Sequence, residues 1–361
     1  MIQTEQIQVE DYHELASFLA FHWDREPEFW LERFQFLWDK NPAFPQDPIR
    51  GFVLKQEGVI KGFIGKFPVK IMLGGQEAIS SNAIGMVIDE DLRGGGLGKQ
   101  LKRQHTESSK GKFIFATTPN EISMKINMAL GFQPLPRGIG DYNLYSTLPI
   151  NGWGTIIIHL YLLKASRSVA SLKTLSSAFG WRKRFKNRTN IRVEKINHAD
   201  EAFDRLWRRT KTIYKNTHVR SADVINWYLL PTQYADREVY AAYDGNDVVG
   251  FIVVRFSIIK KIRFMLCLDL WGSPENSDDI IKSLLIFAKK QATGKNCSAL
   301  LVPHFSKDMS NRLNRMGLLQ AIGKKRNDLF LMPQDFAGNI TVENSYFTYM
   351  SGDKFLGKAV I

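Results

Sequence analysis

A glycine cluster in the first half of the chain has the composition of an anion-binding turn. The apolar run 84–88 ends in Asp89 and Glu90, and glycines and basic residues follow. A strand that passes through a glycine-rich turn into a helix presents free backbone N–H groups and the positive end of the helix dipole to a ligand. The residues of this predicted phosphate-binding turn are Arg93, Gly94, Gly95, Gly96, Leu97, Gly98 and Lys99.

The spacing of these glycines excludes two common phosphate-binding motifs. A P-loop needs four residues between its first glycine and the Gly-Lys pair, but only three lie between Gly94 and Gly98. The dinucleotide fingerprint Gly-x-Gly-x-x-Gly requires a glycine where this chain has Lys99. A third pattern, Arg/Gln-x-x-Gly-x-Gly/Ala, is filled by Arg93, Gly96 and Gly98.

Through this pattern the chain resembles the GCN5-related N-acetyltransferase (GNAT) superfamily, in which the turn holds the pyrophosphate of acetyl-coenzyme A (acetyl-CoA). A second segment supports the resemblance over about residues 1–148. Residues 113–120 predict a short buried strand, and 121–130 predict a helix that ends at a glycine. The residues at the family's usual spacings in this segment are Asn120, Ser123, Ile126, Asn127, Gly131 and Phe132.

The resemblance implies a cofactor and a binding site. The acyl donor would be acetyl-CoA or another acyl-CoA, and a backbone amide of the strand before the turn would polarise its carbonyl. The implied donor-binding residues are Met86, Val87, Ile88, Arg93, Gly94, Gly95, Gly96, Leu97, Gly98, Lys99, Asn120 and Ser123. No Cys/His cluster has zinc spacing, so we expect no metal.

The sequence leaves the catalytic acid and base unassigned. The Tyr that often protonates the departing thiolate in this family is replaced by Asn127, and Asn cannot supply a proton at neutral pH. The strand before the turn also lacks the Glu that many members use as a base. The catalytic candidates are Asn127 itself and Asp89 and Glu90 at the strand end, and capping of the turn is the alternative role for the two carboxylates. His22 and His105 have no feature that favours either.

A faint internal repeat predicts two domains. The hairpin pattern at 52–64 recurs at 240–252, with an aromatic helix before each hairpin, and Gly131-Phe132 has a counterpart in Gly317-Leu318 at nearly the same offset. We therefore expect an α/β (α+β) protein of two tandem GNAT-like domains, each a mixed, mostly antiparallel sheet flanked by helices. The expected divisions are 1–150, a connector at 151–192, 193–335 and a tail at 336–361.

The second copy lacks the glycine turn. Pro274 removes an N–H donor there, and Glu275, Asp278 and Asp279 place carboxylates at the start of the next helix. Carboxylates stabilise a helix start, but they repel a pyrophosphate at the same place. The second domain is therefore interpreted as a structural or substrate-side partner.

The connector carries much of the net charge of +13. It holds nine Lys and Arg residues and no Asp or Glu, and residues 153–169 have a broad apolar face. Three interpretations stay open. It is a crossover helix packed on both domains, or residues 153–188 bind an anionic membrane surface, or its basic turn binds a polyanion such as transfer RNA. No recognised RNA-binding module supports the third.

The preferred function is that of an N-acyltransferase, most simply an N-acetyltransferase, acting on an amine. The tail 344–353 loosely resembles those of GNAT proteins of surface-polysaccharide biosynthesis, which suggests an amino sugar as acceptor. The alternatives are an aminoacyl-tRNA-dependent transferase and a non-catalytic acyl-CoA-binding module. The two cysteines and the absence of a signal peptide indicate a cytoplasmic protein, membrane-peripheral if the connector binds lipid. The oligomeric state is left open.

Overall fold

The computed structural model describes residues 1–117, 119–136, 144–146, 190–233, 236–259, 262–275, 277–303, 305–316, 318–321, 329–333 and 338–351. The chain divides into two compact units. Unit 1 consists of Met1–Leu135 and Asn327–Asn339, and unit 2 of Pro136–Arg326 and Ile340–Ile361. Most of the predicted connector 151–192 lies outside the described residues, so its role stays a prediction.

The sheet of unit 1 is mixed and mostly antiparallel. Its strands in order are β1 (Ile2–Gln6), β2 (Gly51–Gln56), β3 (Val59–Leu73), β4 (Gln76–Ile88), β5 (Ile114–Ala116), β15 (Leu329–Leu331) and β6 (Gln133–Pro134). All neighbours are antiparallel except β4 and β5, which are parallel. β3 is buried along nearly its whole length, which indicates that both faces of the sheet are covered.

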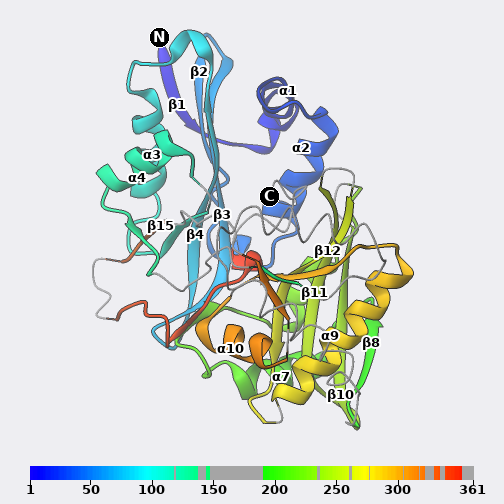
Figure 1. Cartoon of the computed structure of the whole chain (residues 1–361). Helices are drawn as coiled ribbons and strands as arrows, with labels where there is room; N and C mark the ends of the chain where they lie inside the picture. The colour runs from blue at the N-terminus through cyan, green and yellow to red at the C-terminus, as the bar shows by residue number, and fades with distance from the viewer. Residues whose placement is uncertain are drawn as a thin grey trace. The chain divides into compact units, whose positions relative to one another are not determined.

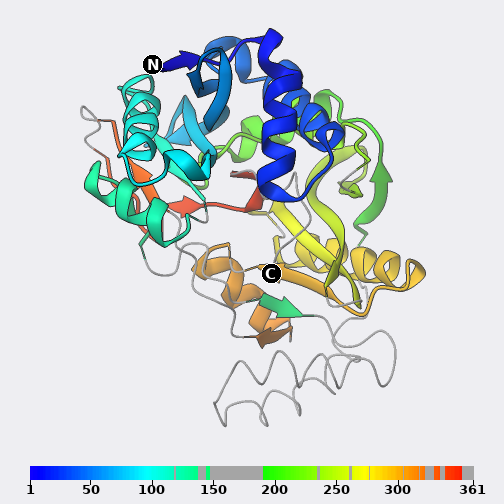
Figure 2. The ribbon, with the colours of Figure 1, turned by 90° about the horizontal axis from the view of Figure 1, so that it is seen from above.

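Helices cover the two faces of this sheet. α1 (Tyr12–Trp23) and α2 (Pro27–Phe34) lie on one face, and α3 (Leu97–Glu107) and α4 (Glu121–Ala129) lie on the other (Figures 1 and 2). α2 continues into the π-helical turn η2 (Gln35–Asp39). The short 3-10 turns of unit 1 are η1 (Val9–Asp11), η3 (Phe44–Gln46) and η4 (Glu90–Leu92). On the side of α3 the core contains Phe52, Leu54, Ile64 and Leu101.

Unit 2 has a second mixed sheet. Its strands in order are β8 (Arg192–Ile196), β10 (Arg237–Asp244), β11 (Asp247–Ile259), β12 (Ile262–Gly272), β13 (Leu300–Pro303), β7 (Leu144–Ser146) and β14 (Leu319–Ala321). Its helices are α7 (Glu201–Thr210), α8 (Ala222–Leu229), α9 (Ser277–Gly294) and α10 (Lys307–Arg315). Strand β9 (Asn216–His218) pairs in parallel with β16 (Ser345–Tyr346), and η5 (Tyr349–Ser351) follows β16.

The two sheets have the same strand order, and the pair β12–β13 is parallel like β4–β5. Each sheet receives a strand from the distant part of the chain. β15 lies between β5 and β6, and β7 lies between β13 and β14. The predicted fold class, mixed sheets flanked by helices, is confirmed, whereas the sequence did not predict the strand exchange. A duplication event stays a prediction.

In the described part of the chain, no helix is both long enough and apolar enough to cross a membrane. Cys267 and Cys297 are both buried and unpaired. Burial raises the pKa of the Cys267 thiol well above its ordinary value, which disfavours the reactive thiolate form.

Candidate functional site

Strands β4 and β5 pair over a short distance only. The parallel pairing joins Ser81–Ala83 to Ile114–Ala116 and ends there. β4 continues beyond this point to Ile88, whereas β5 ends at Ala116, earlier than the predicted strand 113–120. Beyond the last pair, the edge of β4 that faces β5 has no strand partner among the described residues. Two parallel strands that part in this way open a gap in the sheet.

A β-bulge marks the point where the gap begins. Gly65 pairs with Ile84 and Ile64 pairs with Met86, so that Gly85 has no partner on β3. Gly85 has φ of 53°, and a Cβ atom there would lie 2.8 Å from the ring of Trp23. Glycine is therefore required by both backbone and packing. Gly85 was not among the predicted site residues, although a glycine inside a strand is a signal for a bulge.

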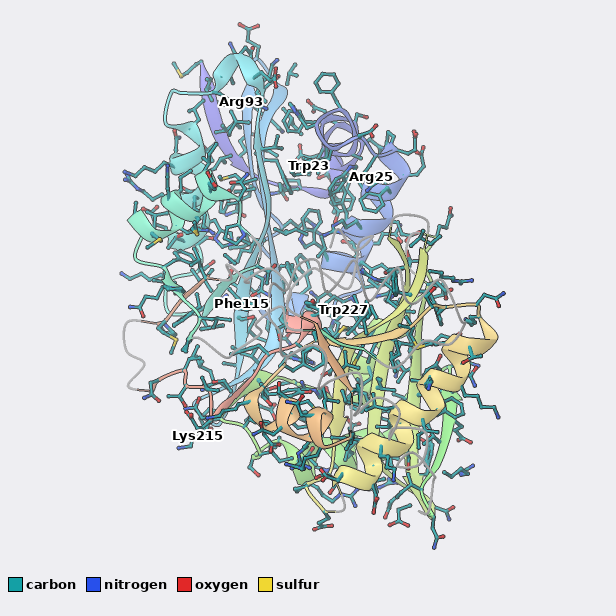
Figure 3. All side chains as sticks on the ribbon, viewed as in Figure 1. Trp23, Arg25, Arg93, Phe115, Lys215 and Trp227 are labelled. Carbon is teal, nitrogen blue, oxygen red and sulfur yellow. The ribbon has the colours of Figure 1, made fainter. Side chains whose placement is uncertain are left out.

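The gap contains a pocket of about 240 Å³. Its wall runs from Trp23 on α1 across the sheet to side chains on α3 and α4. The described residues that line it are Trp23, Ile64, Ala83, Gly85, Met86, Lys102, Ala116, Thr117, Pro119, Asn120, Ser123, Ile126 and Asn127. Figure 3 shows Trp23 on the α1 side of the strands. Of the N-terminal aromatic residues, Trp23 reaches the pocket, whereas Trp38 is fully buried in the core.

The free edge of β4 offers backbone donors to the gap. Asp89 N–H donates to Lys61 O at 2.9 Å, which is the β3 side. Successive N–H groups of a strand point to opposite edges. The amides of Ile88 and Met86 are therefore turned toward the gap, where they can stabilise negative charge on a carbonyl oxygen.

The glycine turn follows directly at the end of β4. Gly94 and Gly96 have φ of 92° and 79°, and Gly96 is the N-cap of α3. The first helical hydrogen bond runs from Gln100 N–H to Gly96 O at 3.1 Å. The amides of the preceding positions 97–99 therefore have no acceptor within the helix. The first turn of α3 contains no acidic residue, so that these amides and the helix dipole are available to an anion.

Three features thus lie together in unit 1: a bulged strand, its separation from a parallel neighbour, and a glycine turn that starts a helix. The fold is that of the GCN5-related N-acetyltransferases. A GCN5-related N-acetyltransferase from Anabaena variabilis aligns with a TM-score of 0.59 and 10% identity over 91% of this chain and 72% of that chain. A GCN5-related N-acetyltransferase from Kribbella flavida aligns with a TM-score of 0.57 and 14% identity over 91% of this chain and 70% of that chain.

The fold likeness extends to an N-myristoyltransferase. Saccharomyces cerevisiae N-myristoyltransferase with bound myristoyl-CoA aligns with a TM-score of 0.56 and 12% identity over 100% of this chain and 89% of that chain. No family model and no curated protein sequence matches the chain. At these identities the likeness concerns the fold alone.

The GNAT-like turn holds its basic residue away from the helix start. Arg93 Nε donates to Ile88 O at 3.1 Å, and its NH1 forms an ion pair of 2.9 Å with Glu90. The Arg93 side chain is 53% exposed, and Figure 3 shows it at the end of the sheet. In this structure Arg93 fixes the strand end, and the backbone of the turn is what faces an anion.

Gly98 brings the two helices of this face together. A Cβ atom there would lie 3.9 Å from Ile126 of α4 and 3.9 Å from Met86 of β4. Leu97 and Ile88 pack beside Met86 on the core. The predicted residues Met86, Asn120 and Ser123 line the pocket. Val87, Ile88 and the turn residues 93–99 do not.

The start of α4 matches the prediction and places two residues at the pocket. Asn120 is the N-cap of α4, and its Oδ1 accepts a hydrogen bond from Ser123 N–H at 2.8 Å. Asn127 is buried at 3% exposure, and its Oδ1 has no hydrogen-bond partner. Asn127 therefore presents an acceptor to the pocket wall, where a ligand N–H can satisfy it.

The carboxylate candidates lie elsewhere. Asp89 Oδ2 forms an ion pair with Lys61 Nζ at 2.8 Å, and its Oδ1 accepts from Glu90 N–H. The hydrogen bond from Lys61 lowers the pKa of Asp89, which makes it a poorer base. Glu90 is exposed and paired with Arg93. Neither carboxylate lines the pocket.

Sequence reasoning also missed Lys102, which does line the pocket. Lys102 lies on α3, is only 3% exposed, and places its Nζ 4.7 Å from the centre of the Phe132 ring. Burial lowers the pKa of Lys102 to about 7. One turn further on, His105 is fully buried. Burial, followed by the charges of Lys102 and Lys66, lowers its pKa well below the ordinary value. A lysine in a polar run gives no sequence signal of such burial.

Proposed function

We propose that this protein is an acyl-CoA-dependent N-acyltransferase whose unit 1 binds the donor. The glycine turn at the start of α3 would hold the pyrophosphate. The pantetheine arm would lie in the gap between β4 and β5, and the amide of Met86, which lines the pocket, would polarise the thioester carbonyl. The reaction forms a bond between the acceptor nitrogen and the acyl carbon and releases coenzyme A.

One observation carries the proposal: the described residues form a pocket that begins where the β4–β5 pairing ends and lies along β4, which leads to the glycine turn and the start of α3. A donor with an acyl end and a phosphate end needs both features. Most of the reaction's acceleration would come from placing the amine on a polarised carbonyl, since orientation alone is worth on the order of 7 to 11 kcal/mol in favourable systems.

The acceptor we propose is a primary amine that enters from the side of Trp23, and acetyl-CoA is the donor to test first. An amino sugar is the proposed acceptor class, and the proposed compartment is the cytoplasm. The segment on which the amino-sugar idea rests is buried within unit 2, where Tyr346 is 1% exposed. The acceptor therefore has to be identified with a panel of amines.

Calorimetry with acetyl-CoA tests donor binding. Gly96→Glu puts a carboxylate at the helix start, where a Cβ atom meets nothing within 4 Å. We expect at least about a 100-fold loss of affinity. The new carboxylate would lie where the pyrophosphate has to bind, and two negative charges that cannot pair with a cation are strongly unfavourable there. The matched control is Gly75→Glu. Gly75 has φ of 85° and equally open surroundings, but lies in the β3–β4 turn at the other end of β4.

The two variants carry the same backbone strain, so any difference between them reports the site. Binding by wild type and Gly75→Glu but not by Gly96→Glu supports the proposal. Absence of acetyl-CoA binding by the wild type would sink it. Release of coenzyme A that rises with one amine of the panel separates an enzyme from a protein that only binds acyl-CoA.

A further inference from the structure

We propose that Lys102 is the catalytic acid of this site, donating a proton from Nζ to the thiolate sulfur as coenzyme A departs. The inference rests on the proposed function and adds to it the residue that the sequence left unassigned. Asn127, at the position of the family's Tyr, cannot fill this role.

The position of Lys102 in the pocket is the first argument. The lining residues include Ala83 and Ala116, the last pair before the strands part, which mark the closed end of the gap. Lys102 lines the same pocket and lies six residues beyond Gly96 in the sequence, which is about 9 Å along the helix axis. The phosphate end of the donor belongs at the glycine turn, so its sulfur end belongs deeper along α3.

The chemistry of the lining is the second argument. Among the described residues that line the pocket, Lys102 has the one titratable side chain, and the rest are apolar or carry a hydroxyl or amide group. Among these lining residues, Lys102 is therefore the one whose side chain can carry a proton that is exchanged inside the pocket.

Comparison with the other buried lysine of unit 1 gives the third argument. Lys66 is fully buried, and its Nζ pairs with Asp47 Oδ1 at 3.0 Å. Lys102 has no ion pair with a described carboxylate, only the ring of Phe132. A buried ammonium without a carboxylate is costly. Such a residue is therefore a candidate for function.

The protonation state suits the task. Because burial lowers the pKa of Lys102 to about 7, its protonated and neutral forms are both present near neutral pH. The other buried ionisable group of α3 is His105, which burial and the charges of Lys102 and Lys66 hold neutral, whereas the adjacent Arg103 is exposed. On β3, Lys66 is engaged by Asp47. Neither neighbour competes for the proton.

The step balances without another reactant. The acceptor nitrogen bonds to the acyl carbon, the C–S bond breaks, and its electron pair stays on sulfur. Lys102 Nζ gives a proton to the sulfur and becomes a neutral amine. The proton that the acceptor nitrogen loses then restores the Lys102 ammonium. The products are the amide and coenzyme A as a thiol.

The first experiment titrates the thiol of bound coenzyme A by thiolate absorbance, which requires no knowledge of the acceptor. An ammonium within about 4 to 6 Å lowers the pKa of the thiol by about 1 to 3 units. The thiolate raises the pKa of the ammonium by the same amount, so that the thiolate–ammonium pair forms at pH values where Lys102 without a bound thiol is neutral. We expect this lowering in the wild type and in Lys110→Met, which removes an exposed lysine. We expect its loss in Lys102→Met and in Lys102→Gln, the second variant should the first fail to fold.

The second readout is the rate of coenzyme A release with the amine panel. We expect Lys102→Met to bind acetyl-CoA like the wild type but to turn over on the order of 10² to 10⁴ times more slowly. Lys102→Arg should also be slow, because arginine keeps its proton. A lowered thiol pKa that survives in Lys102→Met, or equal rates in both proteins, would overturn the role of Lys102. A wild type without binding or turnover would overturn the proposed function instead.

Discussion

The gap between β4 and β5 in unit 1 is open, whereas the corresponding gap between β12 and β13 in unit 2 is filled by protein. The β12–β13 pairing ends at Leu266 and Leu301, much as the β4–β5 pairing does. Beyond it, Tyr346 of β16 contacts Trp271 and Phe305, with ring centres 5.6 and 5.7 Å apart, and donates its hydroxyl to Leu270 O. The Tyr346 hydroxyl thus bonds to a backbone group at a strand edge whose counterpart in unit 1 has no strand partner among the described residues.

A buried charged cluster completes the filling. Arg220 Nε and His218 Nε2 lie 2.8 and 3.0 Å from Asp269 Oδ2 on β12, and Ser351 Oγ lies 3.1 Å from His218 Nδ1. Arg220 and His218 lower the pKa of Asp269, and burial lowers that of His218 to about 4. The serine, histidine and aspartate have the order of a catalytic triad. All are buried, however, and Arg220 already neutralises the carboxylate, which makes the cluster structural.

The N-termini of the corresponding helices α3 and α9 also differ, one being open and the other occupied by side chains. α3 begins at a glycine with no acid in its first turn, whereas Asp278 at the start of α9 pairs with Arg312 and Arg315 of α10 at 2.8 and 3.3 Å. One strand order therefore gives an open pocket when the gap and the helix start are left open. The same strand order gives a filled core when side chains of the same unit occupy the gap and the helix start.

The largest test of this contrast is Asp269→Asn. The substitution leaves Arg220 buried without a counter-charge, and we expect the free energy of unfolding to fall by about 3 to 5 kcal/mol. Urea denaturation followed by tryptophan fluorescence measures it. The control is Glu194→Gln, which removes an exposed ion pair with Arg192 and should cost at most about 1 kcal/mol. Similar losses for the two variants would refute the structural role of the cluster.

The middle test concerns the charge that unit 1 leaves unpaired. The pKa of Lys102 is 10.5 in an unfolded chain and about 7 in the fold. Between these values the unfolded state binds more protons, so that wild-type stability rises with pH. Relative to Lys102→Met, the wild type should gain about 2 to 3 kcal/mol between about pH 6 and pH 9. Urea denaturation at both pH values checks this.

Lys110→Met is the control for that titration, because it removes an exposed lysine instead of a buried one. Its stability difference from the wild type should stay constant within about 0.5 kcal/mol. If the difference for Lys102→Met is equally constant, Lys102 is not desolvated in solution.

The smallest effect is expected from Asp278→Asn. Asp278 is 55% exposed, so that loss of its ion pairs should cost less than about 1 kcal/mol. Gly96→Glu removes donor binding by unit 1, so that a double variant with Asp278→Asn tests binding by unit 2 alone. We expect no acetyl-CoA binding in calorimetry, because the start of α9 still lacks an N–H at Pro274 and still carries the carboxylate of Glu275. Recovered binding would show that the charge at the helix start alone distinguishes the two units.

Local sequence determined much of this protein. The hairpins, the start of α4 at Asn120 and the glycine turn of Gly94 and Gly96 follow from residues that are neighbours in the chain, because turn angles and helix caps are local interactions. The absence of a glycine turn before α9 also follows directly from the local sequence. The resemblance that these patterns support predicted the fold class.

Tertiary structure alone decided the rest. Lys102 lies in a polar run that suits a solvent-facing helix, and only the packing of α3 on the sheet beside Phe132 removes it from water. The gap itself depends on how far two strands distant in sequence stay paired. Its filling in unit 2 depends on Tyr346, which follows β12 by many residues. Burial and desolvation are set by such distant neighbours, so that the chemistry of a pocket cannot be inferred from the residues beside it in the chain.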